Sequence, residues 1–448
     1  MKHPQTPPSS LTFERKHERN WGEFNDDLQW THSNLSGMTG FAQLKRLQRW
    51  SWRTSFSTAK RHLVERLSAL SVENALVEAA KKSQTSISMQ TLLDSGAGRR
   101  LGIDLTDMHE QDLQAKAKRQ IASFLYREMP VRFAHRVLEL QSLPYELCNM
   151  PSIKQVKHWY IRSFEDIMTL PPPINDESEK RFYDSLDSIY NRHAETQVTI
   201  AYGLREFRKS DAIRNSGKKL YEFDDIHRRL DSFNVSRIGI RMLLGHYLEL
   251  GKPHRPGWVG LICEETSPSE VTLEAIEHAT YMCDREFGYA PNVRIRGRTD
   301  LTFAYVPSHL YYILFELLKN SMKATCENHK DAAGDLPAVE IIVGDGEENE
   351  DIVIKISDEG GGIRRAHAKH NIFSYLFTTA QNEALTNSAA NRDFGTEGPL
   401  SGLGYGLGIS RAHARYFGGD LTLYSMDGYG TDAYLYLSRL TNHDEPLL

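Results

Sequence analysis

The sequence predicts an α+β protein with an N-terminal helical bundle and a C-terminal α/β sandwich. Four long stretches with apolar residues at helical spacing follow one another between residues 65 and 265, and this succession indicates a bundle. From residue 266 to 440, helical patterns alternate with β-branched runs, which indicates a layer of helices on one face of a sheet. Residues 441–448 are expected to form a short tail.

Each expected element follows from a local signal. In the bundle we expect helices over residues 119–144, 152–173, 179–209 and 225–250, with Ser152 as the N-cap of the second and prolines ending the first two. In the sandwich we expect helices over 269–288, 312–325 and 404–419, strands over 292–298, 301–307, 338–346 and 351–360, and a terminal hairpin over 420–440. Residues 380–401 are small and polar, which is typical of a mobile loop.

Composition and charge argue against several classes of protein. The net charge of −5 offers no concentrated basic surface of the kind that nucleic-acid binding needs. No apolar run approaches the roughly 20 residues of a membrane span. The four cysteines (148, 263, 283 and 326) have no C-x-x-C spacing, so we expect a reducing compartment and neither a disulfide framework nor a zinc site.

The first 64 residues indicate a targeting region. Residues 1–37 are polar, with three prolines in the first eight positions, and are expected to be disordered. Residues 38–64 contain six Lys or Arg and no acid, which is the composition of a mitochondrial presequence, with a basic surface helix as the alternative. Because presequences begin at the initiator, we hypothesise that Met38 is the true start. N-terminal sequencing of the mature protein would test this, and peptides from residues 1–37 would contradict it.

The helix predicted over residues 312–325 carries an unusual polar face. Glu316, Asn320 and Lys323 fall at positions i, i+4 and i+7, so they share one side of the helix. Downstream, Asp358 ends a strand and is followed by glycines, and alternating glycines at 402, 404, 406 and 408 open another helix. Each feature alone is weak, because a solvated helix face or a tight turn explains it equally well.

Together, and in this order, the three features resemble the Bergerat-type (GHKL) ATP site of gyrases, heat-shock chaperones, mismatch-repair ATPases and histidine kinases. In such a site the amide oxygen of Asn320 can ligate Mg²⁺. Asp358 can accept a hydrogen bond from the adenine amino group, while Gly360 and Gly362 let the backbone approach the ring. The alternating glycines can turn their amides onto phosphates at a helix N-terminus. Residues 380–401 would then be the lid over the nucleotide.

Other nucleotide-binding motifs do not fit the sequence. The chain has no G-x-x-x-x-G-K-[ST] loop, and no strand precedes the glycines at 402–408. A D-F-G at residues 393–395 stands in a polar loop without the other signatures of ordinary protein kinases, so we interpret it as a coincidence.

From about residue 88 to 440 the sequence resembles the mitochondrial 2-oxo acid dehydrogenase kinases, which comprise pyruvate dehydrogenase kinase and branched-chain 2-oxo acid dehydrogenase kinase. The resemblance rests on SMQTLLDSG, REMPVRFAHR, VSRIGIRML, YVPSHLYYILFELLKNSMKAT, ISDEGGGI, FTTA, GLGYGLGISRAHARYFGGDL and YGTDAYLYL. It implies a matrix enzyme that transfers the ATP γ-phosphate to serine on the thiamine-dependent subunit of the dehydrogenase and inactivates the complex. It also implies a homodimer that binds the lipoyl domain of the complex core.

The resemblance further implies roles for individual residues. Glu316 would be the general base toward the serine hydroxyl. The nucleotide site would be lined by Glu316, Leu317, Leu318, Lys319, Asn320, Ser321, Met322, Lys323, Asp358, Gly360, Gly362, Thr378, Thr379, Gly402, Leu403, Gly404, Tyr405, Gly406, Leu407 and Thr431. A pocket for small 2-oxo acids in the helical domain would comprise Tyr160, Ser163, His193, Arg237 and Arg241, where arginine suits a carboxylate. The alternative is a buried histidine and arginines that satisfy one another.

Departures from the family pattern leave the substrate open between the pyruvate and the branched-chain dehydrogenase. Tyr312 stands one turn before Glu316, where pyruvate-directed members usually carry histidine, and the chain stops at Leu448 without their long tail. Residues 305–310, 418–426 and 430–437 point the other way, so we favour pyruvate dehydrogenase. Gly408 stands where the family generally has proline, a change that could loosen the hinge of the lid.

Three rival functions remain at this point. A histidine kinase would need a phosphoacceptor histidine followed by an acid and a proline, and the nearest candidate, His109, lacks the proline. A chaperone-type or repair-type ATPase would use Glu316 to activate water. The intact Glu316, Asn320 and Asp358 argue against a non-catalytic scaffold.

Overall fold

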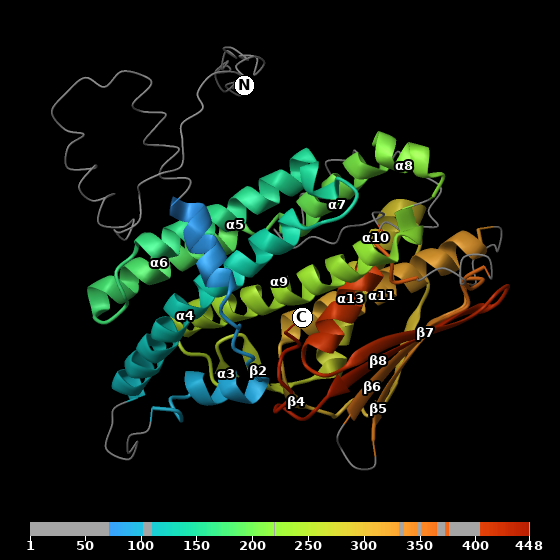
Figure 1. Ribbon diagram of the computed structural model, residues 1–448. Helices are drawn as coiled ribbons and strands as arrows, with labels where there is room; N and C mark the ends of the chain where they lie inside the picture. The colour runs from blue at the N-terminus through green and yellow to red at the C-terminus, as the bar shows by residue number, and fades with distance from the viewer. Residues whose placement is uncertain are drawn as a thin grey trace, which may run out of the picture. The chain divides into compact units, whose positions relative to one another are not determined.

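A computed structural model describes residues 71–101, 110–218, 220–330, 336–346, 351–364, 372–375 and 404–447. The predicted presequence, the predicted loop over 380–401 and the candidates Thr378, Thr379, Gly402 and Leu403 lie outside these residues. Within the described residues, a helical part precedes a part in which helices cover a five-stranded sheet (Figure 1). The predicted α+β class is therefore confirmed.

The helical part is built around the long helix α9 (Asp224–Leu250). Residues 71–80 are helical, and the further helices are α3 (Met89–Gly96), α4 (Glu110–Gln141), α5 (Pro151–Thr169), α6 (Asp176–Arg192), α7 (Thr196–Arg208), α8 (Asp211–Ser216) and α9 (Asp224–Leu250), with 3₁₀ turns at Leu147–Asn149 and Leu220–Glu222. α9 packs against α4 and α6, and it also contacts the sheet-containing part through α13 (Gly406–Tyr416). Among the described helices, none is long and apolar enough to cross a membrane.

Two details of the predicted bundle were wrong. The segment over 179–209 is two helices rather than one, because the chain turns at residues 193–195, where His193 N–H bonds to Ile189 O. The N-cap of α5 is Met150 and not Ser152, because Pro151 takes the first helical position, where its missing N–H costs nothing. The Ser152 hydroxyl donates instead to Glu206 Oε1 of α7 at 2.6 Å.

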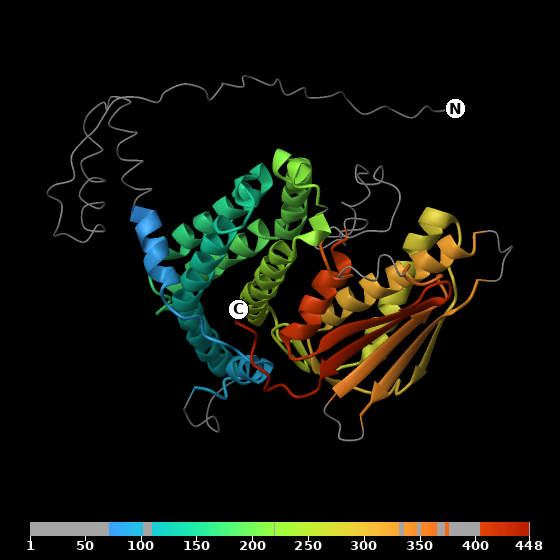
Figure 2. The ribbon, with the colours of Figure 1, turned by 45° about the vertical axis from the view of Figure 1, so that its right-hand side comes forward.

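The main sheet has the strand order β3-β5-β6-β8-β7. Its strands are β3 (Val293–Gly297), β5 (Val339–Asp345), β6 (Asp351–Asp358), β7 (Asp420–Met426) and β8 (Gly430–Ser438). β3 pairs with β5 in parallel, and every other neighbouring pair is antiparallel. The helices α10 (Pro268–Phe287), α11 (Pro307–Asn328) and α13 lie over one face of this sheet (Figure 2). The predicted sandwich and terminal hairpin are thus confirmed.

A second, smaller sheet was not predicted. It consists of β1 (Trp258–Val259), β2 (Ile262–Thr266) and β4 (Phe303–Tyr305) in the order β1-β2-β4. The strand expected over 301–307 exists as β4, but it pairs with β2 and not within the main sheet.

The alternation of side chains along β6 decides which residues reach the covering helices. Ile352, Ile354 and Ile356 are fully buried, and they point to the same side of the strand because successive side chains alternate. Asp358 continues this series by two residues and is buried as well. The Asp358 carboxylate therefore lies on the helix-covered face of the sheet, where α11 packs on β6.

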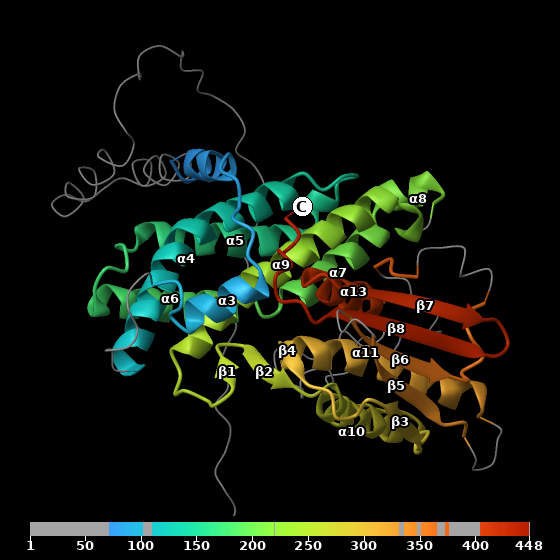
Figure 3. The same cartoon turned by 90° about the horizontal axis from the view of Figure 1, so that it is seen from below.

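The tail after β8 packs against the helical part. Gln90 N–H donates to Thr441 O at 2.7 Å, and Glu445 N–H donates to Ile87 O at 3.1 Å. Glu445 is buried and accepts hydrogen bonds from Arg132 of α4 and Tyr416 of α13. The C-terminal end of the chain accordingly lies beside α9 in both Figure 1 and Figure 3. The tail therefore joins the helical part to the sheet-containing part.

Candidate active site

Helix α11 places Glu316 against the start of α13. Its apolar side, with Leu314, Leu318 and Met322 fully buried, holds the helix in the core. Glu316 is itself buried, and a Cβ added to Gly406 would lie only 1.9 Å from Glu316 Oε2. Only glycine at 406 allows this approach. The carboxylate therefore faces the first turn of α13, whose free amides carry partial positive charge.

Lys319 supplies a counter-charge to Glu316. Its ammonium donates to Glu316 Oε1 at 2.5 Å, and both side chains are buried. A buried carboxylate needs such a partner, because removing a charge from water is costly. The pair fixes the orientation of Glu316 within α11 and leaves Oε2 toward Gly406.

The other residues of the predicted polar face of α11 lie in different environments. Asn320 is exposed one turn after Glu316. Lys323 donates to Glu286 Oε1 of α10 at 2.5 Å, so its charge is directed to α10. Leu317 is buried in the core, as are Leu318 and Met322. Of these residues, Glu316 is the one that lies against Gly406 at the start of α13, and Lys319 is bonded to it.

Asp358 is hydrogen-bonded by the neighbouring Gly360 and by residues from two distant parts of the chain, Ser321 and Thr431. Its Oδ1 accepts the Gly360 N–H at 2.9 Å, and Thr431 lies directly opposite it on β8. Burial raises the pKa of Asp358, and hydrogen bonds from Gly360, Ser321 and Thr431 oppose that rise. The result is a buried carboxylate at the end of a strand, next to α11.

The glycines after Asp358 are required by close backbone contacts. A Cβ at Gly360 would lie 2.5 Å from the Cβ of Ala324 on α11. Gly362 has a φ of +69°, and a Cβ there would lie 2.1 Å from Met426 O. This turn therefore passes closer to α11 and β7 than any side chain permits.

The second glycine-rich segment opens α13. Gly404 has a φ of +69°, Tyr405 is buried, and Gly406 is the first residue of the helix, with Leu407 following it. Gly408 lies inside the first turn, where a Cβ would come within 2.9 Å of Phe373 O. Backbone amides at this helix start are positioned to bind an anion.

Two histidines beside Tyr312, His309 and His413, were not predicted as site residues. The His413 ring of α13 lies 5.2 Å from the Tyr312 ring and 4.5 Å from the His309 ring, measured between centroids. Burial lowers the pKa of His413 well below its ordinary value, with further lowering by His309, Arg237 and Arg241. The stretch RAHARYFGG contained the signal, since His413 follows the glycine-rich segment at helical spacing.

The five residues of the predicted acid pocket are brought together by α5, α6 and α9. Ser163 Oγ lies 2.9 Å from His193 Nε2, and the Tyr160 ring lies 4.3 Å from the His193 ring. Burial lowers the pKa of His193 to about 3, reinforced by the charges of Arg237, Arg192 and Arg241. His193 is therefore neutral within a group of positive charges, which favours an anionic ligand.

Two residues around this pocket were not predicted. Arg192 donates to Ser163 Oγ at 2.9 Å and to Asp166 Oδ2 at 2.7 Å. Tyr190 is the second of these residues, and the centre of its ring lies 4.0 Å from the guanidinium carbon of Arg241. The ring nitrogens of His193 lie 2.9 Å from Ser163 Oγ and 3.4 Å from Thr196 Oγ1.

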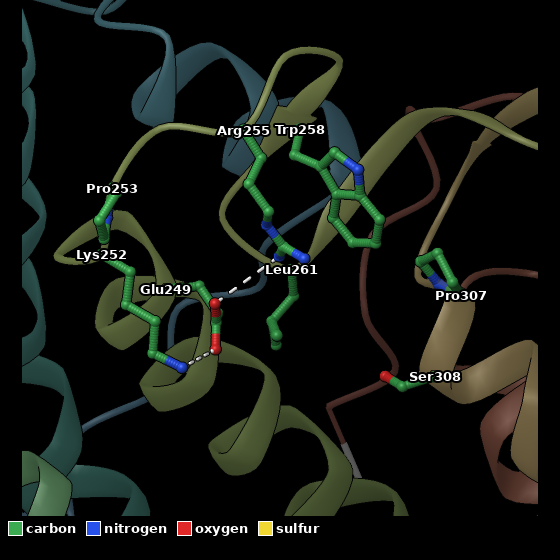
Figure 4. Close-up of a pocket in the computed structure, with 8 residues that line it drawn as sticks. All are labelled: Glu249, Lys252, Pro253, Arg255, Trp258, Leu261, Pro307 and Ser308. Carbon is green, nitrogen blue, oxygen red and sulfur yellow. Dashed lines mark hydrogen bonds and ion pairs between the residues drawn. The ribbon is translucent and has the colours of Figure 1, made fainter.

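A cavity of about 570 Å³ lies away from these residues, between the end of α9, the β1–β2 region and the start of α11 (Figure 4). It is lined by Glu249, Lys252, Pro253, Arg255, Trp258, Leu261, Pro307 and Ser308. Glu249 pairs with Lys252 at 2.6 Å and with Arg255 at 3.7 Å, so the charges of this cavity are satisfied internally. It contains none of the predicted nucleotide-binding residues.

The covered sheet, the strand-end carboxylate and the glycine-opened helix define a GHKL-type ATP-binding domain. Residues 305–441 match the family model described as "Histidine kinase-, DNA gyrase B-, and HSP90-like ATPase". Residues 86–263 match the model described as "Mitochondrial branched-chain alpha-ketoacid dehydrogenase kinase".

Relatives extend this likeness over both domains. The mitochondrial "[Pyruvate dehydrogenase (acetyl-transferring)] kinase" of Arabidopsis thaliana is 44% identical over 330 residues, which cover 73% of this chain and 86% of the relative. The Drosophila melanogaster protein of the same name is 38% identical, covering 72% and 78%. Isozyme 4 of Mus musculus is 34% identical, covering 81% and 83%. The chain belongs to the family of mitochondrial 2-oxo acid dehydrogenase kinases and is an ATP-dependent protein kinase, as the sequence predicted.

Proposed function

We propose that this kinase phosphorylates a serine on the thiamine-dependent subunit of pyruvate dehydrogenase and thereby inactivates the complex. The observation that carries the proposal is the approach of the buried Glu316 carboxylate to Gly406 at the start of α13. A proton acceptor then stands beside the turn that would hold the ATP phosphates. The names of the relatives support pyruvate dehydrogenase as the target.

In this proposal the residues have distinct tasks. Glu316 takes the proton of the serine hydroxyl as the serine oxygen attacks the γ-phosphorus, and the bond from that phosphorus to ADP breaks, so that ADP leaves. Lys319 holds the Glu316 carboxylate in place. The amides at the start of α13 bind the phosphates. Asp358 accepts a hydrogen bond from the adenine amino group, with Thr431 beside it. Leu317, Leu318 and Met322 are buried in the core and support these groups by packing.

The exposed amide of Asn320 suits Mg²⁺, which prefers oxygen ligands and retains several waters. No group of three His, Cys, Asp or Glu that could hold a metal ion occurs among the described residues. We therefore propose that the ion is held by the Asn320 oxygen together with phosphates and water. Bound magnesium would neutralise charge on the transferring phosphate.

We propose that the group of Tyr160, Ser163, His193, Arg237 and Arg241 binds small 2-oxo acids. A carboxylate would be met by arginines that are partly or fully withdrawn from water, where charge-assisted hydrogen bonds are strongest. We also propose a matrix location and binding of the lipoyl domain of the complex core, following the relatives' mitochondrial names and the family resemblance.

We propose that the kinase forms a homodimer through the sheet face that α10, α11 and α13 leave uncovered. Ile342, Tyr424 and Met426 on this sheet are 43%, 64% and 67% exposed, and a second copy would cover them. Sedimentation equilibrium is expected to show a dimer that Tyr424→Glu shifts toward monomer. An unchanged dimer in this variant would exclude this face as the interface.

Labelled ATP and each purified dehydrogenase complex test the proposed reaction. We expect radiolabel on serine of the thiamine-dependent subunit of pyruvate dehydrogenase, and little on the branched-chain complex. Preferential labelling of the branched-chain complex would contradict the choice of substrate. Steady hydrolysis without a protein acceptor would favour an ATPase, and a phosphoamidate that survives base but not acid would favour a histidine kinase.

A further inference from the structure

Tyr375 joins the helical part to the candidate nucleotide site. Its side chain is completely buried, and its hydroxyl lies 2.6 Å from Asp231 Oδ1 of α9. Burial, reinforced by Asp231, raises the pKa of Tyr375 well above its ordinary value, so the hydroxyl stays protonated and donates this bond. Burial raises the pKa of Asp231, while the bond from Tyr375 and the nearby His227 oppose that rise.

A second bond from Tyr375 to α9 passes through its backbone. The Tyr375 N–H donates to His227 Nδ1 at 3.3 Å, while His227 Nε2 lies 3.2 Å from Leu220 O. These two partners are compatible with one tautomer, because Nδ1 must accept and Nε2 must donate. Asp231 and His227 lie one turn apart on α9. Asp231 therefore holds the side chain of Tyr375, and His227 holds its backbone.

The other side of Tyr375 contacts the glycine-rich start of α13. The Tyr375 and Tyr405 rings lie 5.1 Å apart, and Tyr405 immediately precedes Gly406. A Cβ added to Gly408 would lie 3.0 Å from Tyr375 Cε1. The tyrosine thus fills the space between α9 and the first turn of α13.

We propose that Tyr375 is a positioning residue for nucleotide binding: it fixes the first turn of α13 to α9 through Asp231 and His227. The inference rests on the proposed function, since it takes the start of α13 as the phosphate-binding turn. If α13 lost this support, its first turn would sample other positions, and ATP would have to order it on binding.

The test uses the full chain and an equilibrium titration of ATP, with phosphoryl transfer measured in parallel. Tyr375→Phe keeps the ring but removes the bond to Asp231, and it is expected to weaken ATP binding about tenfold. Asp231→Ala, on an exposed helix position, should have a similar effect, and Asp231→Asn, which keeps an acceptor, should restore most of the affinity. The double variant Tyr375→Phe/Asp231→Ala should be no weaker than either single variant.

Tyr247→Phe is the matched control. Like Tyr375, Tyr247 is fully buried and donates its hydroxyl hydrogen bond to a carboxylate. Tyr247 is a residue of α9, and its partner is Glu179 on α6. A loss that reflects only general stability would appear equally in this variant. ATP affinity unchanged in both Tyr375→Phe and Asp231→Ala, or lowered equally by Tyr247→Phe, would overturn the inference. Failure of the wild type to bind ATP would instead overturn the proposed function.

Discussion

Replacing Glu316 with glutamine is expected to lower kcat for phosphoryl transfer by about 10²–10⁴ while ATP binding stays close to that of the wild type. Glutamine has nearly the same shape and can occupy the space beside Gly406, but it takes up no proton. The loss should therefore fall on the chemical step. Single-turnover transfer at saturating ATP, with a separate ATP titration, measures the two effects independently.

Glu286→Gln provides the matched control for this experiment. Glu286 pairs with Lys323 of the same helix α11, but it lies on α10 and more than a third of its side chain is exposed. Its substitution should leave kcat within about twofold of the wild type, as expected for an exposed ion pair. A Glu316→Gln variant with kcat as high as that of Glu286→Gln would show that another group accepts the serine proton.

The positions in the fold of the main nucleotide-site candidates could be predicted, because local periodicity determines which face of a helix or strand each residue takes. Helical spacing puts Glu316 and Asn320 on successive turns, and strand alternation puts Asp358 in phase with the buried isoleucines of β6. Glycines at 360 and 406 mark places where backbone and carboxylate approach too closely for a side chain. These signals lie within single segments, so no long-range information was needed.

Features that depend on contacts between distant segments were not predicted, because no signal within a single segment indicates them. The break between α6 and α7 contains no glycine or proline, and it is stabilised by contacts of His193 with Ser163 on α5. β2 is recognisable through its pairing with β1 and β4. Tyr375 lies in a segment without periodicity, and its role emerges only when α9 and α13 are in place.

The packing of the tail is a further feature that depends on distant partners. A polar segment that ends a chain is normally expected to be solvated, yet Glu445 is buried beside Arg132. Arg132 donates to Glu128 Oε1 at 2.9 Å, to Thr85 O at 2.7 Å and to both oxygens of Glu445. Burial opposes the charge of Arg132, but its bonds to Glu445 raise its pKa above the ordinary value. The charge is therefore retained inside the protein.

Glu445→Ala is expected to lower the free energy of unfolding by about 3 kcal/mol, because it leaves a buried arginine without its main counter-charge. The effect should lie near the low end of the range for broken buried pairs, since Glu128 still bonds to Arg132. Tyr416 of α13 loses its hydrogen-bond partner at the same time, which adds to the cost. Urea unfolding followed by circular dichroism measures the difference.

Asp444→Ala is the control, because Asp444 precedes Glu445 and is exposed. It should change the free energy of unfolding by no more than about 0.5 kcal/mol. If Glu445→Ala were as mild as this control, the buried pair would contribute little, and the tail would be held by its backbone bonds to Ile87 and Gln90. A large loss confined to Glu445 would instead show that one side chain ties α4 to α13, so that the tail stabilises the contact between the helical part and the kinase domain.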